Sequence, residues 1–257
     1  MFVHRSMFQP LRRLALIQIF SCSLVAVRSA TAQIDTTERV QVHVTPYAWL
    51  SGLTGAIGVR DVAVHVSVPF ADVLNVLKFA AMGSVEAHRG PWLGSVDMIF
   101  VSLGAQRSVA IRGDTGSFDL KQHQTILQPM GGYSIGNAQW ALDLLAGVRY
   151  WNLGVTLDTD RPGAVNERSG SRGWIDALGG ARFRVVPAPR LHAELGGDAG
   201  GGGSKSTWQA HAAAGVDVSS IVTVGVEYRY LDVNYDRDNL LFDTRTHGPA
   251  IGAKLRL

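Results

Sequence analysis

Regular alternation between apolar and polar side chains is the feature that most constrains the fold of this chain. In segment 221–236 one face carries Val222, Val224, Val226, Tyr228 and Tyr230. The residues between them are Thr223, Gly225, Glu227 and Arg229. Segments 138–158, 171–186 and 190–200 repeat the pattern. A period of two residues is that of a β-strand with one apolar face, so the sequence predicts an all-β protein.

Two architectures produce this alternation: a soluble sheet with one wet face, and a transmembrane β-barrel with a polar lumen. The connections favour the barrel. Short turns fall at 89–91, 134–137, 187–189 and 218–220. Polar connections, most of them longer, lie between these turns at 58–78, 105–116, 159–171, 201–206 and 233–241. Outer-membrane barrels alternate short periplasmic turns with longer outer loops in this way.

The spacing of these connections predicts a single antiparallel transmembrane β-barrel of about ten strands. The expected strands are 40–57, 79–90, 92–104, 117–133, 138–158, 171–186, 190–200, 206–217, 221–236 and 242–257. Eight strands are the alternative if two of the weaker segments merge. An even number of strands places both termini on the same side, which is the periplasmic side in an exported barrel.

Composition agrees with a barrel and excludes other classes. Hydrophobic residues make up 46% of the chain and charged residues 18%, which is too apolar for disorder. No apolar run of the length of a membrane-spanning helix follows the first thirty residues, which excludes a polytopic helical membrane protein. All 29 glycines lie within the alternating part of the chain, where glycine relieves crowding inside a small closed barrel.

The first 32 residues have the pattern of a secretory signal peptide. A basic region ends at Arg13, an apolar region follows over 14–27, and Ala30-Thr31-Ala32 is a small-residue cleavage motif. We therefore predict a signal peptide over 1–32, cleavage after Ala32 and a barrel domain over 33–257. Lipidation at Cys22 is the alternative. Since Cys22 is the single cysteine, the exported chain has no thiol chemistry and no disulfide.

The basic net charge also belongs to the signal peptide. The chain carries 24 basic and 21 acidic side chains, and four arginines lie in residues 1–32, which contain no acidic residue. Removing those four leaves 20 basic against 21 acidic groups. The electrostatic argument for a nucleic-acid partner therefore fails.

Aromatic residues fall where a barrel has its interfacial girdles. Trp92 and Trp140 follow short turns directly, and Tyr133 precedes one. Trp140 and Tyr150 share a face ten residues apart, which is a rise of roughly 25 Å for a strand tilted by about 40°, the height of the apolar band. We predict that Trp92, Tyr133, Trp140 and Tyr150 belong to the girdles; packing in a soluble core is the alternative.

The polar face of the alternation predicts the contents of the lumen. The charged residues predicted to form a network there are Glu86, Asp97, Asp143, Arg149, Asp176, Arg182, Glu194, Asp198, Glu227 and Arg229. Acids and bases are mixed, whereas a selective pore favours a ring of one sign. Because barrels of eight or ten strands are largely filled by side chains, we predict a narrow lumen closed by charge pairing. A passage for small solutes is the alternative.

Two groups of residues have the types that catalysis or metal binding needs. His65 and Ser67 share one strand face, as a base and a nucleophile would. No acidic partner or strained nucleophile turn accompanies them. His192, Glu194, Asp198 and His211 have ligand chemistry, but polar lumenal residues have the same spacing. We therefore predict no catalytic residues, no metal site and no cofactor.

Segment 70–77 departs from the strand pattern. Its apolar residues recur at the spacing of one helical face, within the longest expected connection. The sequence predicts a short helix, either packed over the rim or dipped into the lumen as a lid or plug.

Three segments resemble a family of small, uncharacterised, porin-like outer-membrane β-barrel proteins of bacteria. They are 45–50 (TPYAWL), 142–151 (LDLLAGVRYW) and 228–235 (YRYLDVNY). The resemblance covers nearly all of residues 33–257 and implies an outer-membrane barrel. It implies no reaction, ligand or catalytic residue.

The functional prediction is a non-enzymatic barrel in the bacterial outer membrane. It has an envelope structural role, a surface-interaction role, or a role in small-solute passage. A hydrolase of lipid or peptide acting at the rim is the alternative. The expected partners are outer-membrane lipid and lipopolysaccharide, the barrel assembly machinery during insertion and a surface ligand that the sequence does not identify.

Overall fold

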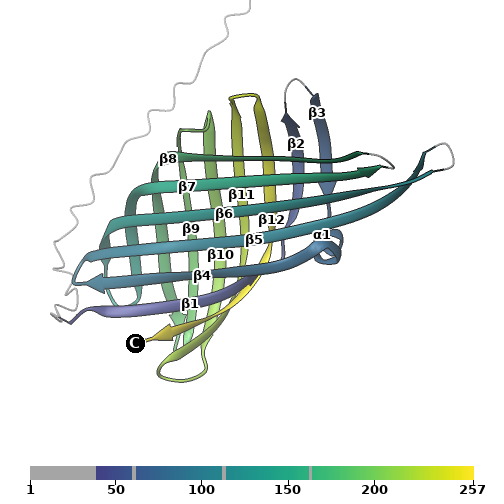
Figure 1. Ribbon diagram of the computed structural model, residues 1–257. Coiled ribbons are helices and arrows are strands. Elements are labelled where there is room, and N and C mark those ends of the chain that lie inside the picture. Colours follow the sequence, from purple (N-terminus) through teal and green to yellow (C-terminus); the bar gives the residue numbers. More distant parts are fainter. Residues whose placement is uncertain (1–38, 60–61, 112–113, 162–163) are drawn as a thin grey trace, which may run out of the picture. The chain divides into compact units, whose positions relative to one another are not determined.

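The structure is a computed structural model that describes residues 39–257 except 60–61, 112–113 and 162–163 (Figure 1). The predicted signal peptide, its cleavage after Ala32 and Cys22 lie outside the described residues and stay predictions. Among the described residues, no helix is both long and apolar enough to cross a bilayer.

The described chain contains one short helix, α1 (Phe70–Val76), and twelve strands. The strands are β1 (Gln41–Trp49), β2 (Gly52–Val59), β3 (Val62–Val68), β4 (Leu77–Arg89), β5 (Trp92–Ile111), β6 (Asp114–Gly136), β7 (Trp140–Arg161), β8 (Ala164–Ala188), β9 (Leu191–Gly202), β10 (Ser206–Asp217), β11 (Val222–Arg237) and β12 (Leu240–Arg256).

Ten of these strands close into an antiparallel barrel. β4 to β12 pair in chain order, and β1 completes the ring by pairing with both β4 and β12. β2 and β3 form an additional hairpin that extends the wall, because β2 pairs with the first half of β12 while β1 pairs with the second half. The prediction of a single all-β barrel of ten strands is confirmed, and the alternative of eight is wrong.

The structure differs from the predicted boundaries at one side of the barrel. The expected strand 40–57 is interrupted at residues 50–51, and the expected connection 58–78 contains both β3 and α1. The sequence also predicts loops over 105–116 and 159–171. This loop prediction is wrong. The pair β5–β6 and the pair β7–β8 are each hydrogen-bonded up to the end of the hairpin. A strand that projects into water can be polar on both faces, so polarity alone does not end it.

The helix prediction over 70–77 matches α1. None of the residues of α1 is buried, and the helix lies near β2 and β5. This excludes a plug within the lumen and fits a helix packed against the barrel wall.

The two ends of the barrel differ in construction. At one end, the terminal end, β1 begins, β12 ends and the strands are joined by short turns such as 90–91 and 189–190. At the opposite end, the loop end, β5 to β8 extend far beyond their neighbours (Figure 1). β8 has 25 residues and β9 has 12, which at ~3.3 Å per residue is a difference of roughly 40 Å along the strand.

Polarity inverts along β11. Up to Tyr230 the outward residues are apolar or aromatic, and Val226 on this face is 58% exposed. Beyond Tyr230 the outward positions are Asp232, Asn234 and Asp236, and the inward positions become apolar and buried. A lipid-facing surface must be apolar and a water-facing one need not be, so the apolar band of the barrel ends near Tyr230.

This inversion predicts that the same substitution has a large effect at one position of the outward face of β11 and almost none at another. Val226→Arg places a cation on the outward face in the middle of the apolar band, where it costs about 2–4 kcal/mol. Asn234→Arg makes the same change beyond the band, where we expect a free-energy change within about 0.5 kcal/mol. Urea unfolding of both variants in lipid vesicles measures the difference. Equal stabilities would show that the apolar band does not end near Tyr230.

Candidate functional site: the barrel lumen

Arg149 on β7 lies at the centre of the lumenal polar residues and is fully buried. Its Nη2 donates to Asp198 Oδ1 at 2.6 Å, and its Nη1 donates to Thr207 Oγ1 at 2.7 Å. Nε and Nη2 both donate to Gln128 Oε1, at 3.0 and 2.8 Å. A buried charge is tolerated only when it is paired and hydrogen-bonded, and Arg149 meets both conditions through partners on β6, β9 and β10.

Asp143, also on β7, is the centre of a second cluster and is fully buried. It accepts hydrogen bonds from Arg182 at 2.8 Å, from Arg184 at 2.8 and 2.9 Å and from Ser134 at 2.6 Å. Arg182 also pairs with Glu86 on β4, with its Nη1 2.6 Å from Glu86 Oε2. Since β4 and β8 are separated by three strands in the sheet order, this pair joins distant parts of the wall.

Arg229 on β11 forms the third cluster. It donates to Glu227 on its own strand at 2.6 Å and to Asp97 on β5 at 2.9 Å. The guanidinium also lies over the rings of Tyr47 and Trp49, 5.0 and 5.6 Å from their centroids. Such contacts between a cation and an aromatic face add to the ion pairs. This cluster links β1, β5 and β11 through side chains.

Together, these three clusters and their partners form what we call the polar network. Eight of the ten charged residues predicted for the lumen belong to it: Arg149, Asp198, Asp143, Arg182, Glu86, Arg229, Asp97 and Glu227. Asp176 also points inward, but it accepts hydrogen bonds from Ser204 N and Oγ at the β9–β10 connection. Glu194 lies 3.1 Å from His211 Nε2. The sequence predicts that these residues face inward, but it does not predict which acidic residue pairs with which basic residue.

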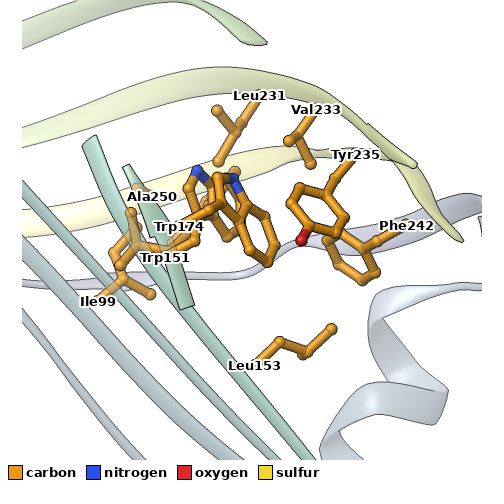
Figure 2. Close-up of a cluster of buried hydrophobic side chains, with 11 residues drawn as sticks. Ile99, Trp151, Leu153, Trp174, Leu231, Val233, Tyr235, Phe242 and Ala250 are labelled. Atoms are coloured by element: carbon orange, nitrogen blue, oxygen red, sulfur yellow. The ribbon is translucent and has the colours of Figure 1, made fainter. Parts of the chain in front are cut away.

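Apolar side chains fill the lumen on the loop side of the polar network. On β7 the next inward residues after Arg149 are Trp151 and Leu153, and on β11 Leu231 and Val233 follow Arg229. We call the whole buried group the aromatic cluster. Its members are Trp49, Ile99, Ile126, Trp151, Leu153, Trp174, Leu231, Val233, Tyr235, Phe242 and Ala250 (Figure 2).

Ring stacking joins the two sides of the aromatic cluster. Trp151 on β7 stacks on Trp174 of β8 with centroids 5.5 Å apart, and Trp174 stacks on Tyr235 of β11 at 4.1 Å. Phe242 on β12 contacts both tryptophans (Figure 2). The sequence prediction of a polar lumen missed this cluster. The signal that could have found it is the change of the inward residues of 231–235 from polar to apolar.

The predicted girdle residues lie on the outer surface of the wall. Trp92 packs edge-on against Tyr133 with centroids 5.1 Å apart, and Trp140 stacks on Phe183. Tyr150 is partly exposed, and its hydroxyl accepts a hydrogen bond from Asn152. Toward the loop end a further outward stack was missed by the sequence prediction. It joins Trp208, Tyr230 and His247.

A cavity of about 350 Å³ lies in the lumen at the terminal end. Its lining includes His43, Tyr47, Arg184, Glu194 and Arg229, so it reaches residues of the polar network. The lumen therefore contains a cavity at the terminal end, then the polar network, then the aromatic cluster.

The residues considered for catalysis and metal binding are not brought together. His65 and Ser67 are exposed on β3, and although their backbones pair with β2, their side chains make no hydrogen bond to any described residue. His192 lies 2.8 Å from Asp217, His211 contacts Glu194, and Asp198 is bound by Arg149. Among the described residues, these contacts do not assemble a nucleophile, base and acid, nor do they join the four candidate ligands.

No protein-family model matches the sequence, and no curated protein matches it. Solved structures do match the fold. The outer membrane protease OmpT from Escherichia coli is 10% identical with a TM-score of 0.55, covering 86% of this chain and 98% of the protease. The translocator domain of the autotransporter NalP from Neisseria meningitidis is 14% identical with a TM-score of 0.44, covering 87% and 91%.

The likeness to the protease, at this identity, shows a common fold and no common activity. The chain has the fold of bacterial outer-membrane β-barrel proteins, which confirms the fold that the sequence resemblance implies.

Proposed function

We propose that this protein is a closed, non-enzymatic outer-membrane barrel with an envelope structural or surface-interaction role. The terminal end faces the periplasm and the loop end faces the outside. The outward face of the wall contacts membrane lipid and lipopolysaccharide, and the barrel assembly machinery inserts it. No nucleic acid is a partner, because the exported chain carries no net positive charge.

The observation that carries this proposal is that two buried groups of side chains, the polar network and the aromatic cluster, follow one another along the lumen. The guanidinium of Arg149 is held between three strands by its own hydrogen bonds, so it cannot swing aside without breaking them. Trp151 and Trp174 lie directly beyond it and are almost fully buried. A water-filled passage needs polar walls and open space, and the aromatic cluster provides neither.

The long hairpins at the loop end support a role at the cell surface. A 25-residue strand tilted by about 40° rises roughly 60 Å, more than twice the ~25 Å apolar band. β5 to β8 therefore project well beyond the membrane. β9 and β10 have 12 residues each and end close to the membrane, so the wall is interrupted there and does not continue as a closed tube.

A liposome-swelling assay tests the proposal against small-solute passage. Proteoliposomes with the wild-type protein should swell in sugars and amino acids no faster than protein-free liposomes, because the lumen is closed. A general porin in the same lipid is the positive control. Swelling that depends on solute size would contradict the closed barrel and establish a passage.

The hydrolase alternative needs a separate assay. We expect no product when the purified protein is incubated with phospholipid, lipopolysaccharide or unstructured peptides. Hydrolysis of any of these that is lost in His65→Gln would overturn the proposal. It would show that the exposed His65 and Ser67 of β3 are a catalytic pair.

A further inference from the structure

Two histidines and one glutamate meet inside the barrel at the terminal end. His43 on β1 is the register partner of Glu86 on β4, so the two side chains lie next to each other on the inward face. His88 follows Glu86 by two residues and therefore shares that face. Neighbouring positions on adjacent strands thus bring all three side chains together.

The distances fit one shared ion. One ligand atom from each of the three side chains lies within 4.8 Å of the other two. His88 Nε2 is 2.7 Å from Glu86 Oε1, and the rings of His43 and His88 have centroids 5.9 Å apart. His43 Nδ1 is buried and has no hydrogen-bond partner. A buried ring nitrogen without a partner is costly, and a metal ion would satisfy it.

Arg182 holds the carboxylate of Glu86 in place. It binds Glu86 Oε2 at 2.6 Å and leaves Oε1 directed at His88. Partners of this kind orient metal ligands and are a regular feature of metal sites. The charge of Arg182 is itself paired with Asp143. The nearby Arg256, register partner of His43, is held by Asp217, so its charge is also partly compensated.

We propose that His43, Glu86 and His88 form a binding site for a divalent transition-metal ion of the zinc type. Two imidazoles and one carboxylate are ligands that Zn²⁺ accepts, with a water in the fourth position of its tetrahedron. His43 lines the cavity of about 350 Å³ at the terminal end, which supplies room for that water and a path for the ion. The site does not depend on whether the lumen conducts.

Isothermal titration with ZnCl₂ tests the site on protein purified from outer membranes without a histidine tag. We expect one Zn²⁺ per chain. His43→Gln and His88→Gln should each weaken binding by more than about 100-fold, beyond the roughly 10- to 100-fold effect of losing a group that only orients a ligand. His192→Gln and His211→Gln are matched controls, because these inward-facing histidines pair with Asp217 and Glu194 instead. They should bind Zn²⁺ like the wild type.

A second measurement separates loss of the site from loss of the fold. With Co²⁺ as the probe, the wild type should give the visible absorption of a four-coordinate ion, and both His43→Gln and His88→Gln should lose it. Their circular dichroism should stay that of a barrel. Absence of Zn²⁺ binding in the wild type would overturn the proposal. Binding that survives in both variants, or that is lost only in the controls, would also overturn it.

Discussion

Replacing Arg149 with alanine is expected to lower the free energy of unfolding by about 3–5 kcal/mol. The variant leaves the carboxylate of Asp198 buried without its cation, and Gln128 and Thr207 each lose a donor. Removing one partner of a buried ion pair costs more than the pair contributes, because the remaining charge stays out of water. Urea unfolding in lipid vesicles, followed by tryptophan fluorescence, measures the change.

Arg245→Ala is the control for this prediction. Arg245 also pairs with an aspartate, Asp232, but its side chain is 64% exposed, and exposed pairs contribute about 0–1 kcal/mol. The two variants remove the same side chain from the same kind of pair and differ in burial. If Arg149→Ala is no more destabilising than Arg245→Ala, the polar network does not stabilise the barrel.

Replacing Trp174 with alanine is expected to cost about 3–5 kcal/mol as well. Trp174 is 6% exposed and contacts Trp151, Tyr235 and Phe242, so its removal leaves a cavity between β8 and β11. Few other contacts join these strands, because β9 and β10 stand between them in the sheet. Unfolding in lipid vesicles followed by circular dichroism is the measurement, since the substitution changes fluorescence.

Trp208→Ala is the matched aromatic control. Trp208 stacks on Tyr230 on the outer surface and is 41% exposed, so its removal opens no internal cavity. We expect a cost of about 0.5–1.5 kcal/mol, the range of an aromatic pair. A larger loss in Trp208→Ala than in Trp174→Ala would show that the outer girdle, rather than the aromatic cluster, stabilises the loop-end half of the barrel.

The barrel could be predicted from the sequence because its signal is local. Strand alternation and short turns are properties of adjacent residues, and they gave ten strands and the inward face of Arg149 and Asp143. The charge pairs could not be predicted in the same way. Arg182 reaches Glu86 across three strands, and Arg229 reaches Asp97, residues far apart in the sequence. Such pairs depend on barrel closure and register.

The loop-end half was mispredicted for a different reason. The prediction treats one face as polar along the whole strand, whereas a strand that leaves the membrane exchanges its faces. Leu231, Val233 and Tyr235 keep the inward parity of Arg229 but have the opposite polarity. Searching each strand for such an exchange would have located the aromatic cluster. It would also have shown that polar segments such as 105–116 can continue as strands.

The central claim is that the polar network and the aromatic cluster close the lumen, and single-channel recording in planar lipid bilayers tests it most directly. The double variant Arg149→Ala with Trp174→Ala removes a central side chain of each group and is expected to carry current, which shows that insertion and detection work. The wild-type protein should insert and carry no steady current. A steady, ion-selective conductance of the wild type would contradict the account.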